Sequence, residues 1–424
     1  MSKLSTILAV TLAALLLAGC GKHPSGKVED STVQTWTIIF YGSAYNNLSS
    51  DIKSNIEVLS HEALPLYGAR KKLLVFTHCA RNDSDFSTPV NGYLVQMSLN
   101  YKGLPQFDTL KTYPSDILST DPAVMRTVLN DAAAAAPSDH YGLILSSHGT
   151  GWLPEGYYNN GERVFRNSKT ASLEAPANGF KMDLCDDGLP KTKTFGAEFY
   201  KDGGNTYSHE MNLPDLAAGL PYKFDYIIFD ACFMGGIETA WELREKAGKI
   251  CFSSAEILAE GFDYREFGPA LIKDDPSPEE FAKAFFEHYD AMKGAYRTAT
   301  ITVVDCSRMQ PLADVCRDLF DSYRGALSSL DPSGVQPYFR DGKHWFYDLE
   351  DILVNAGISQ SEKASLESAL GSCITYKAAT PSVLNLFDIV NFCGLSMYLP
   401  CDGSANLDNF YKTLAWNRAT GLVE

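Results

Sequence analysis

The sequence predicts an α/β fold, in which helices pack on the faces of a central sheet. Short apolar, β-branched runs recur along the chain and alternate with segments of helical or loop character. Two of these runs end in reactive side chains: residues 142–147 (GLILSS) precede His148, and residues 225–230 (DYIIFD) precede Cys232. In open α/β sheets, ligands bind outside the carboxyl ends of the parallel strands. We therefore expect His148 and Cys232 to share one edge of the sheet.

The same pattern places the individual elements. We expect strands at residues 35–41, 72–77, 92–97, 141–147, 225–230, 250–254 and 298–304, and helices at residues 51–63, 121–135, 236–246, 278–292 and 310–327. Asp121 followed by Pro122 is typical of a helix start, because aspartate caps free amides and proline suits the first helical position.

The chain divides into three expected parts. Residues 21–304 carry most of the strands and form the expected catalytic core. Residues 305–424 are largely helical, with a last strand expected at residues 393–400 and stopped by Pro400, and are expected to form a carboxyl-terminal helical subdomain that completes the fold. Within the core, residues 153–213 are rich in Gly, Asn, Lys and Asp and show no sustained period. Such long irregular loops are uncommon and are often functional.

The third part, residues 1–20, is an expected export signal. Lys3 precedes an apolar run, and the small residues of LAGC end at Cys20. The run is shorter than the roughly 20 residues that span a bilayer, and LAGC resembles a bacterial lipobox. We therefore expect an exported bacterial lipoprotein, lipidated at Cys20 and anchored to the cell envelope at the outer membrane or cell surface. The alternative is a simple signal peptide or short anchor in which Cys20 is incidental.

Composition and charge limit the partners. The chain is 45% hydrophobic, as globular proteins are, and its net charge of -16 argues against nucleic acid and against electrostatic binding to anionic lipid. Ten cysteines are present, and apart from Cys20 and Cys232 their number is even, as disulfides would require. Buried free thiols are the alternative, especially at Cys251 and Cys306. No Cys or His spacing typical of a structural zinc site is present.

His148 and Cys232 together suggest nucleophilic catalysis. A thiol with a pKa near 8.5 is only slightly ionised at neutral pH, so a catalytic cysteine needs a base or a helix amino terminus nearby. His148 can take the thiol proton and return it to a leaving amine. The backbone amides of Gly149 and Cys232 are candidate donors to the oxyanion, and Gly149 lets the backbone approach a substrate closely.

Two motifs carry a family resemblance. Residues 148–152 (HGTGW) and 229–234 (FDACFM) resemble the clostripain-like cysteine peptidases, relatives of caspases, legumain and gingipains. The resemblance extends over residues 36–41, 46–48, 238–243, 261–264 and 394–400, and so over nearly the whole mature chain. It implies a caspase-like three-layer sandwich with a mostly parallel central sheet.

The resemblance also implies an endopeptidase that cleaves proteins or peptides after exposed arginine, sometimes lysine, with His148 and Cys232 as its dyad. Asp230 matches an acidic residue that helps form the pocket for the basic side chain, because a guanidinium is recognised well by carboxylates. Glu260 is our candidate for a second acid, with Glu256 and Asp263 as alternatives. Asp230 also fits a capping or turn residue.

Maturation is a further implication, because members of this family are often cut by themselves in the loop between the dyad strands. Arg163, Arg166 and Lys169 are the candidate sites, although they also fit ordinary solvated loop charges. The family expectation is a monomer that stays together after the cut. The sequence requires no cofactor; a response to calcium occurs in the family, but no EF-hand loop is present here.

The match has two departures. The family usually carries aspartate where this chain has Tyr45, and tryptophan where it has Phe262. These differences favour one alternative to a peptidase, a surface binding protein that keeps the fold and has lost turnover. Independently of them, the same dyad could perform acyl transfer or amidase chemistry on a non-protein substrate.

Overall fold

The computed structural model describes residues 34–83, 88, 90–157, 190–193, 198–202, 205–340 and 345–424. The elements below all belong to one structural unit, residues 35–424. The expected signal peptide with Cys20 lies outside the described residues, as do Arg163, Arg166 and Lys169. No helix within the described ranges is long and apolar enough to cross a membrane.

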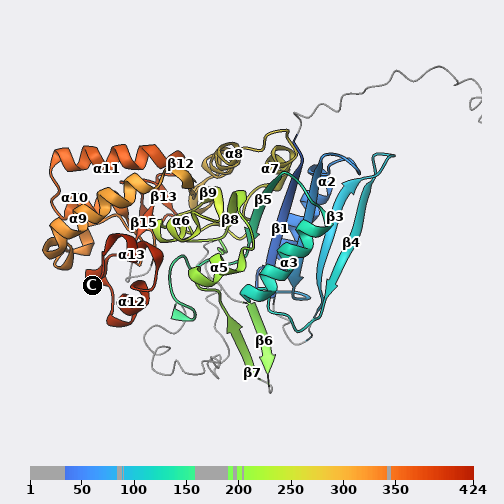
Figure 1. The fold of residues 1–424 in the computed structure, drawn as a ribbon, viewed down its shortest axis with the longest axis horizontal. Helices are drawn as coiled ribbons and strands as arrows, with labels where there is room; N and C mark the ends of the chain where they lie inside the picture. The colour runs from blue at the N-terminus through green and yellow to red at the C-terminus, as the bar shows by residue number, and fades with distance from the viewer. Residues whose placement is uncertain are drawn as a thin grey trace, which may run out of the picture. The chain divides into compact units, whose positions relative to one another are not determined.

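A nine-stranded sheet forms the centre, in the order β12-β10-β9-β8-β5-β1-β2-β3-β4 (Figure 1). Its strands are β1 (Trp36–Ala44), β2 (Lys71–Cys79), β3 (Gly92–Leu99), β4 (Pro105–Tyr113), β5 (His140–Ser146), β8 (Phe224–Asp230), β9 (Ala247–Phe252), β10 (Thr300–Asp305) and β12 (Ile374–Ala379). The five central strands, from β9 to β2, run parallel, whereas the pairs at both edges are antiparallel. The expected mostly parallel sheet is confirmed.

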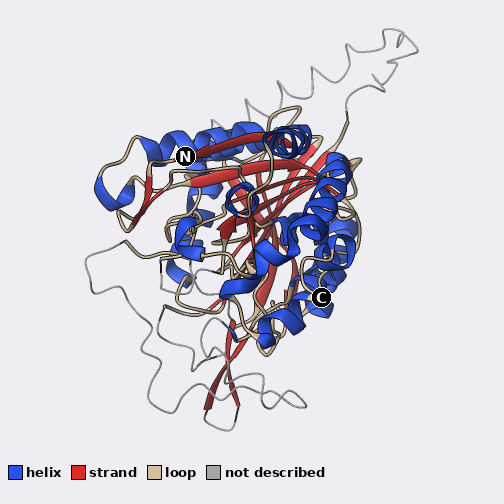
Figure 2. Cartoon of the chain, turned by 90° about the vertical axis from the view of Figure 1, so that its left-hand side faces the viewer, coloured by secondary structure: helices blue, strands red, loops and turns tan. Residues whose placement is uncertain are grey.

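Helices cover both faces of this sheet and complete three layers (Figure 2). They are α2 (Ser49–Glu62), α3 (Pro122–Ala135), α5 (Leu213–Gly219), α6 (Ile237–Leu243), α7 (Tyr264–Leu271), α8 (Pro278–Asp290), α9 (Gln310–Ser328), α10 (Leu349–Asn355), α11 (Gln360–Cys373), α12 (Ala405–Tyr411) and α13 (Ala415–Thr420). Helix α7 contacts both α2 and α8. In a second group, α5 contacts α3 and α6, and α6 also contacts α13. The central strands are therefore buried on both sides, which explains their unbroken apolar sequences.

The predicted elements are present with ends shifted by a few residues, and Asp121 caps α3 by accepting the amides of Ala123 and Val124. The prediction missed β4 and β12. Strand β4 lies at the sheet edge and is mostly exposed, so its sequence lacks a buried face. The prediction also treated residues 153–213 as irregular, whereas they contain a hairpin of β6 (Glu198–Asp202) and β7 (Asn205–His209).

The carboxyl-terminal segment contributes directly to the core. It supplies edge strand β12, and the short strands β11 (Tyr347–Asp348) and β15 (Ser396–Met397) pair beside the start of α6, where Ser396 bridges Gly236. All eight cysteines in the described part of the chain are free thiols, and only Cys401 is not buried. The buried-thiol alternative therefore holds for Cys251 and Cys306.

Glu238, in the first turn of α6, is a buried carboxyl group that should make stability depend on pH. Its Oε1 accepts the amide of Tyr398 and the hydroxyl of Tyr411, yet burial raises its pKa from 4.5 to about 7. The folded protein thus binds a proton that the unfolded chain releases between these values. We expect the free energy of unfolding to fall by about 3 kcal/mol as pH rises from 4.5 to 7.

Urea unfolding at pH 4.5 to 8 measures this loss. Glu238→Gln removes the titrating group and should flatten the pH profile, whereas Glu242→Gln, in the same helix, should leave it unchanged. A Glu238→Gln profile as steep as that of the parent would contradict the assignment.

Candidate active site

The ends of β5 and β8 bring His148 and Cys232 into neighbouring loops. These strands are adjacent and parallel, and their last paired residues are Ser146 and Asp230. His148 and Cys232 each lie two residues beyond that pair. Between them, Gly149 packs on the Cys232 backbone so closely that a Cβ on Gly149 would lie 2.2 Å from the Cys232 carbonyl oxygen. Only glycine fits here, and the two loops therefore touch backbone to backbone.

A strained turn positions the thiol of Cys232. Phe233 has a φ of 58°, a left-handed conformation that side chains rarely adopt. Its ring stacks on Phe346 with centroids 4.8 Å apart, and its amide donates to the Ala255 carbonyl, so packing holds the turn in place. The buried Cys232 Sγ accepts the Ile257 amide at 3.0 Å. A donor at this position stabilises a thiolate more than a thiol.

Asn47 orients the imidazole of His148. His148 Nε2 lies 2.6 Å from Asn47 Oδ1, and since an amide oxygen only accepts, Nε2 carries the ring proton. The basic nitrogen of the neutral ring is then Nδ1. Burial, and secondly the positive charge of Lys193, hold the pKa of His148 well below its usual value of 6.5. His148 is therefore a neutral base at neutral pH while Lys193 is nearby.

The chain's own Lys193 occupies the buried space beside Asp230. The Lys193 ammonium lies 2.6 Å from Asp230 Oδ2, and both side chains are fully buried. Lys193 Nζ also donates to Ser146 Oγ and to the Asp230 carbonyl, each at 3.3 Å, while the hydroxyls of Ser146 and Tyr264 donate to the same carboxylate oxygen. Gly261 has a φ of 67° and lies directly against this ion pair, since a Cβ on it would lie 2.6 Å from Lys193 Nζ.

Residues 191–193 run alongside residues 257–259, in the loop that follows β9. Thr192 forms an antiparallel bridge with Leu258; the Lys193 amide donates to the Ile257 carbonyl at 2.9 Å, and the Lys191 carbonyl accepts the Ala259 amide at 2.8 Å. The Lys193 carbonyl accepts the Gly149 amide at 3.3 Å. The carbonyl of the residue in the acidic pocket thus points at the amide expected to bind an oxyanion.

The three candidates for a second acid lie elsewhere around this strand. Glu260 has an exposed side chain, and Asp263 caps α7 and pairs with Arg265. Glu256 is buried and accepts a hydrogen bond at 3.0 Å from the hydroxyl of Thr192, the residue that precedes Lys193. Asp230 is the acid that contacts the Lys193 ammonium within the described residues.

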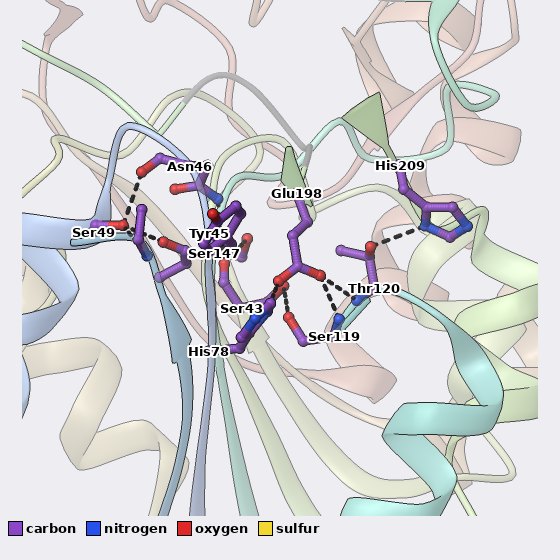
Figure 3. A network of polar contacts seen from close by, with 12 residues as sticks. Ser43, Tyr45, Asn46, Ser49, His78, Ser119, Thr120, Ser147, Glu198 and His209 are labelled. Carbon is purple, nitrogen blue, oxygen red and sulfur yellow. Dashed lines mark hydrogen bonds and ion pairs between the residues drawn. The ribbon is translucent and has the colours of Figure 1, made fainter. Parts of the chain in front are cut away.

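A polar network anchors the chain again shortly after Lys193 (Figure 3). Glu198, at the start of β6, is fully buried; one carboxylate oxygen pairs with His78 Nδ1, and the other accepts the amides of Ser119 and Thr120. Tyr45 stacks on the His78 ring with centroids 5.1 Å apart. Tyr45, the first departure from the family pattern, therefore packs on the network around Glu198. Phe262, the second departure, packs between α7 and α8.

Sequence reasoning missed Lys193, Asn47 and Glu198. Lys193 has a weak local signal, since residues 190–193 (PKTK) follow a long Gly- and Asp-rich stretch. The signal for Asn47 lay in the NNL motif, to which the sequence alone assigned no catalytic role. A cavity of about 100 Å³ is lined in part by His148 and Gly149, and Ser119, Thr120 and Glu210 are among its other lining residues.

Comparison with known proteins identifies a family. The model of the clostripain family matches residues 193–417, and no curated protein matches the chain. Among solved structures, an inactive zymogen C11 protease from Parabacteroides distasonis is similar, with a TM-score of 0.70 and 24% identity over 91% of this chain and 97% of that one. A secreted C11 cysteine protease from Bacteroides thetaiotaomicron has a TM-score of 0.69 and 21% identity over 91% and 99%. These structures share the fold.

Proposed function

Because the chain belongs to the clostripain family and is a cysteine peptidase, we propose that it is an endopeptidase that cleaves after basic residues through His148 and Cys232. The observation that carries the specificity is the buried ion pair of Lys193 with Asp230. The chain's own lysine already occupies the pocket that a substrate side chain would fill, and its carbonyl already meets Gly149.

The reaction follows from these contacts. His148 takes the Cys232 proton, and Sγ attacks the carbonyl carbon of the basic residue, so that the carbonyl becomes an oxyanion held by the Gly149 amide. The C–N bond then breaks, and His148 gives its proton to the leaving amine. Water, deprotonated by His148, hydrolyses the acyl-enzyme and releases the carboxylic acid product and the free thiol.

Asp230 also supports a preference for arginine over lysine. Its Oδ2 is shared by three donors, whereas Oδ1 is buried and makes no hydrogen bond in the described part of the chain. A guanidinium presents two donors in one plane and can bind both oxygens of a carboxylate, which a single ammonium does less well. Arginine is thus the better partner for this group, and lysine is accepted.

Maturation by self-cleavage is part of this proposal. The extended strand at 191–193 supports cleavage of the bond between Lys193 and Thr194, since that bond directly follows the carbonyl held by Gly149. Arg163, Arg166 and Lys169, in the same loop, stay candidates for further cuts. We also propose that the protein is an exported lipoprotein held on the cell envelope through Cys20; a response to calcium is an expectation of the family resemblance.

Cleavage of a peptide panel by the purified chain under reducing conditions tests the proposal. Peptides with Arg, Lys, Asp or Leu before the scissile bond should be cut in the order Arg, then Lys, with only slow cleavage of the others. Cys232→Ala should abolish cleavage, whereas Cys401→Ala, which removes a partly exposed thiol, should not. No cleavage by the processed chain would favour a binding protein, and cleavage that ignores the basic residue would favour another acyl-transfer reaction.

A further inference from the structure

A second acidic site lies beside Asn47, separate from Asp230. Lys191 Nζ lies 2.6 Å from Asp51 Oδ2 on α2 and 3.2 Å from Asp83 Oδ2, and it donates to the Asn47 carbonyl at 2.7 Å. The Lys191 ammonium therefore has three oxygen partners from two segments that are distant in sequence. Asp83 is itself fixed, because its Oδ1 accepts the Ser50 amide at 2.7 Å.

The spacing between this site and Asp230 indicates which residue of a bound peptide would reach it. Lys191 precedes Lys193 by two residues, and the hydrogen bonds of both residues with residues 257–259 fix the register of the strand. Any peptide that binds in this register with its basic residue at Asp230 carries the side chain two residues earlier to Asp51 and Asp83. The intervening residue, represented by Thr192, meets Glu256.

We infer that Asp51 and Asp83 form a specificity subsite for a basic side chain, so that preferred substrates carry the pattern basic, any residue, basic before the scissile bond. This inference rests on the proposed peptidase function. The site is partly open, with 34% of the Lys191 side chain exposed, against 25% for Asp51 and 35% for Asp83. Solvent screens such charges, so the second site adds selectivity to the buried Asp230 site without replacing it.

The experiment uses the processed enzyme and reporter peptides X-Thr-Lys, with X as Lys, Arg, Ala or Glu. Lys and Arg at X should raise kcat/KM about tenfold over Ala, and Glu should lower it; two partly screened charge pairs are consistent with this size. The advantage should shrink between 50 and 500 mM salt. Equal rates for all four peptides would overturn the inference, whereas a failure to cut any of them would count against the peptidase function instead.

Variants assign the effect to these residues. The double change Asp51→Asn and Asp83→Asn should remove the preference for Lys over Ala at X. Asp318→Asn with Asp321→Asn, exposed acids on α9, is the matched control and should keep the preference. Asp51→Lys should favour Glu at X; a variant that still prefers Lys would overturn the assignment. The peptide series on the unaltered enzyme tests the subsite even if a variant fails to fold.

Discussion

Asp230→Asn is expected to lower kcat/KM for arginine and lysine peptides by roughly 10²- to 10⁴-fold. The reason is desolvation: a cation that enters this fully buried pocket leaves its water behind, and only the Asp230 charge compensates it. Loss of one partner of such a buried pair costs about 3–5 kcal/mol, which corresponds to this range. Because asparagine has nearly the same size, the change removes the charge and leaves the shape of the pocket.

Two comparisons separate this effect from misfolding. The variant must first be cut by immobilised wild-type enzyme, since it should process itself poorly. Tyr264→Phe, which removes only one hydrogen bond to Asp230, should then cost about tenfold at most. The slow cleavage of a leucine peptide should be unchanged in Asp230→Asn. A parallel loss on leucine and arginine peptides would mean that Asp230 supports the catalytic loop and does not select the substrate.

Lys193→Ala is expected to have the second largest effect, stopping cleavage after residue 193 while exposing Asp230 and Cys232. Without the Lys193 ammonium, Asp230 would be a buried charge with no cationic partner. This would destabilise the conformation in which residues 191–193 pair with residues 257–259 by about 3–5 kcal/mol. Residues 191–193 should therefore detach from residues 257–259. An arginine-based covalent probe should then label Cys232 in the uncut chain at least 10²-fold faster than in an uncut chain that keeps Lys193.

Lys193→Arg is the control, because it keeps the charge and should still be cut. Intact mass and amino-terminal sequencing locate the cut, and a labelling time course measures the access of the probe to Cys232. Thr194→Pro supplies an uncut reference chain that keeps Lys193, because proline at position 194 blocks hydrolysis of the bond between residues 193 and 194. If Lys193→Ala were still processed at the normal rate, the maturing cut would lie elsewhere, with Arg163, Arg166 and Lys169 as the next candidates.

The sequence was informative where strands are buried on both faces and where motifs are local. The apolar runs before His148 and Cys232 predicted two adjacent strand ends, and the register of Ser146 with Asp230 brings those ends together. The Asp121 cap was likewise visible, because a capping aspartate acts on amides only two and three residues away.

What could not be predicted depends on contacts between distant segments. The burial of Lys193 on Asp230, of Glu198 against His78, and of Lys191 between Asp51 and Asp83 each joins residues far apart in the sequence. Charged residues in a polar loop are usually solvated, so nothing local distinguishes these from their neighbours. Strand β12 was missed for a similar reason: it follows α11 directly and gains its place only by pairing with β10.

The order of strands has a further consequence for a chain cut after Lys193. Strands β1 to β5 precede the cut and β8 to β12 follow it, so the seam between β5 and β8 becomes a boundary between two polypeptides, with His148 on one and Cys232 on the other. Folding of the uncut chain is a unimolecular process, whereas renaturing the cut protein requires two molecules to meet. We therefore expect the recovery of a cut protein from denaturant to depend on its concentration, whereas the recovery of the uncut chain should not.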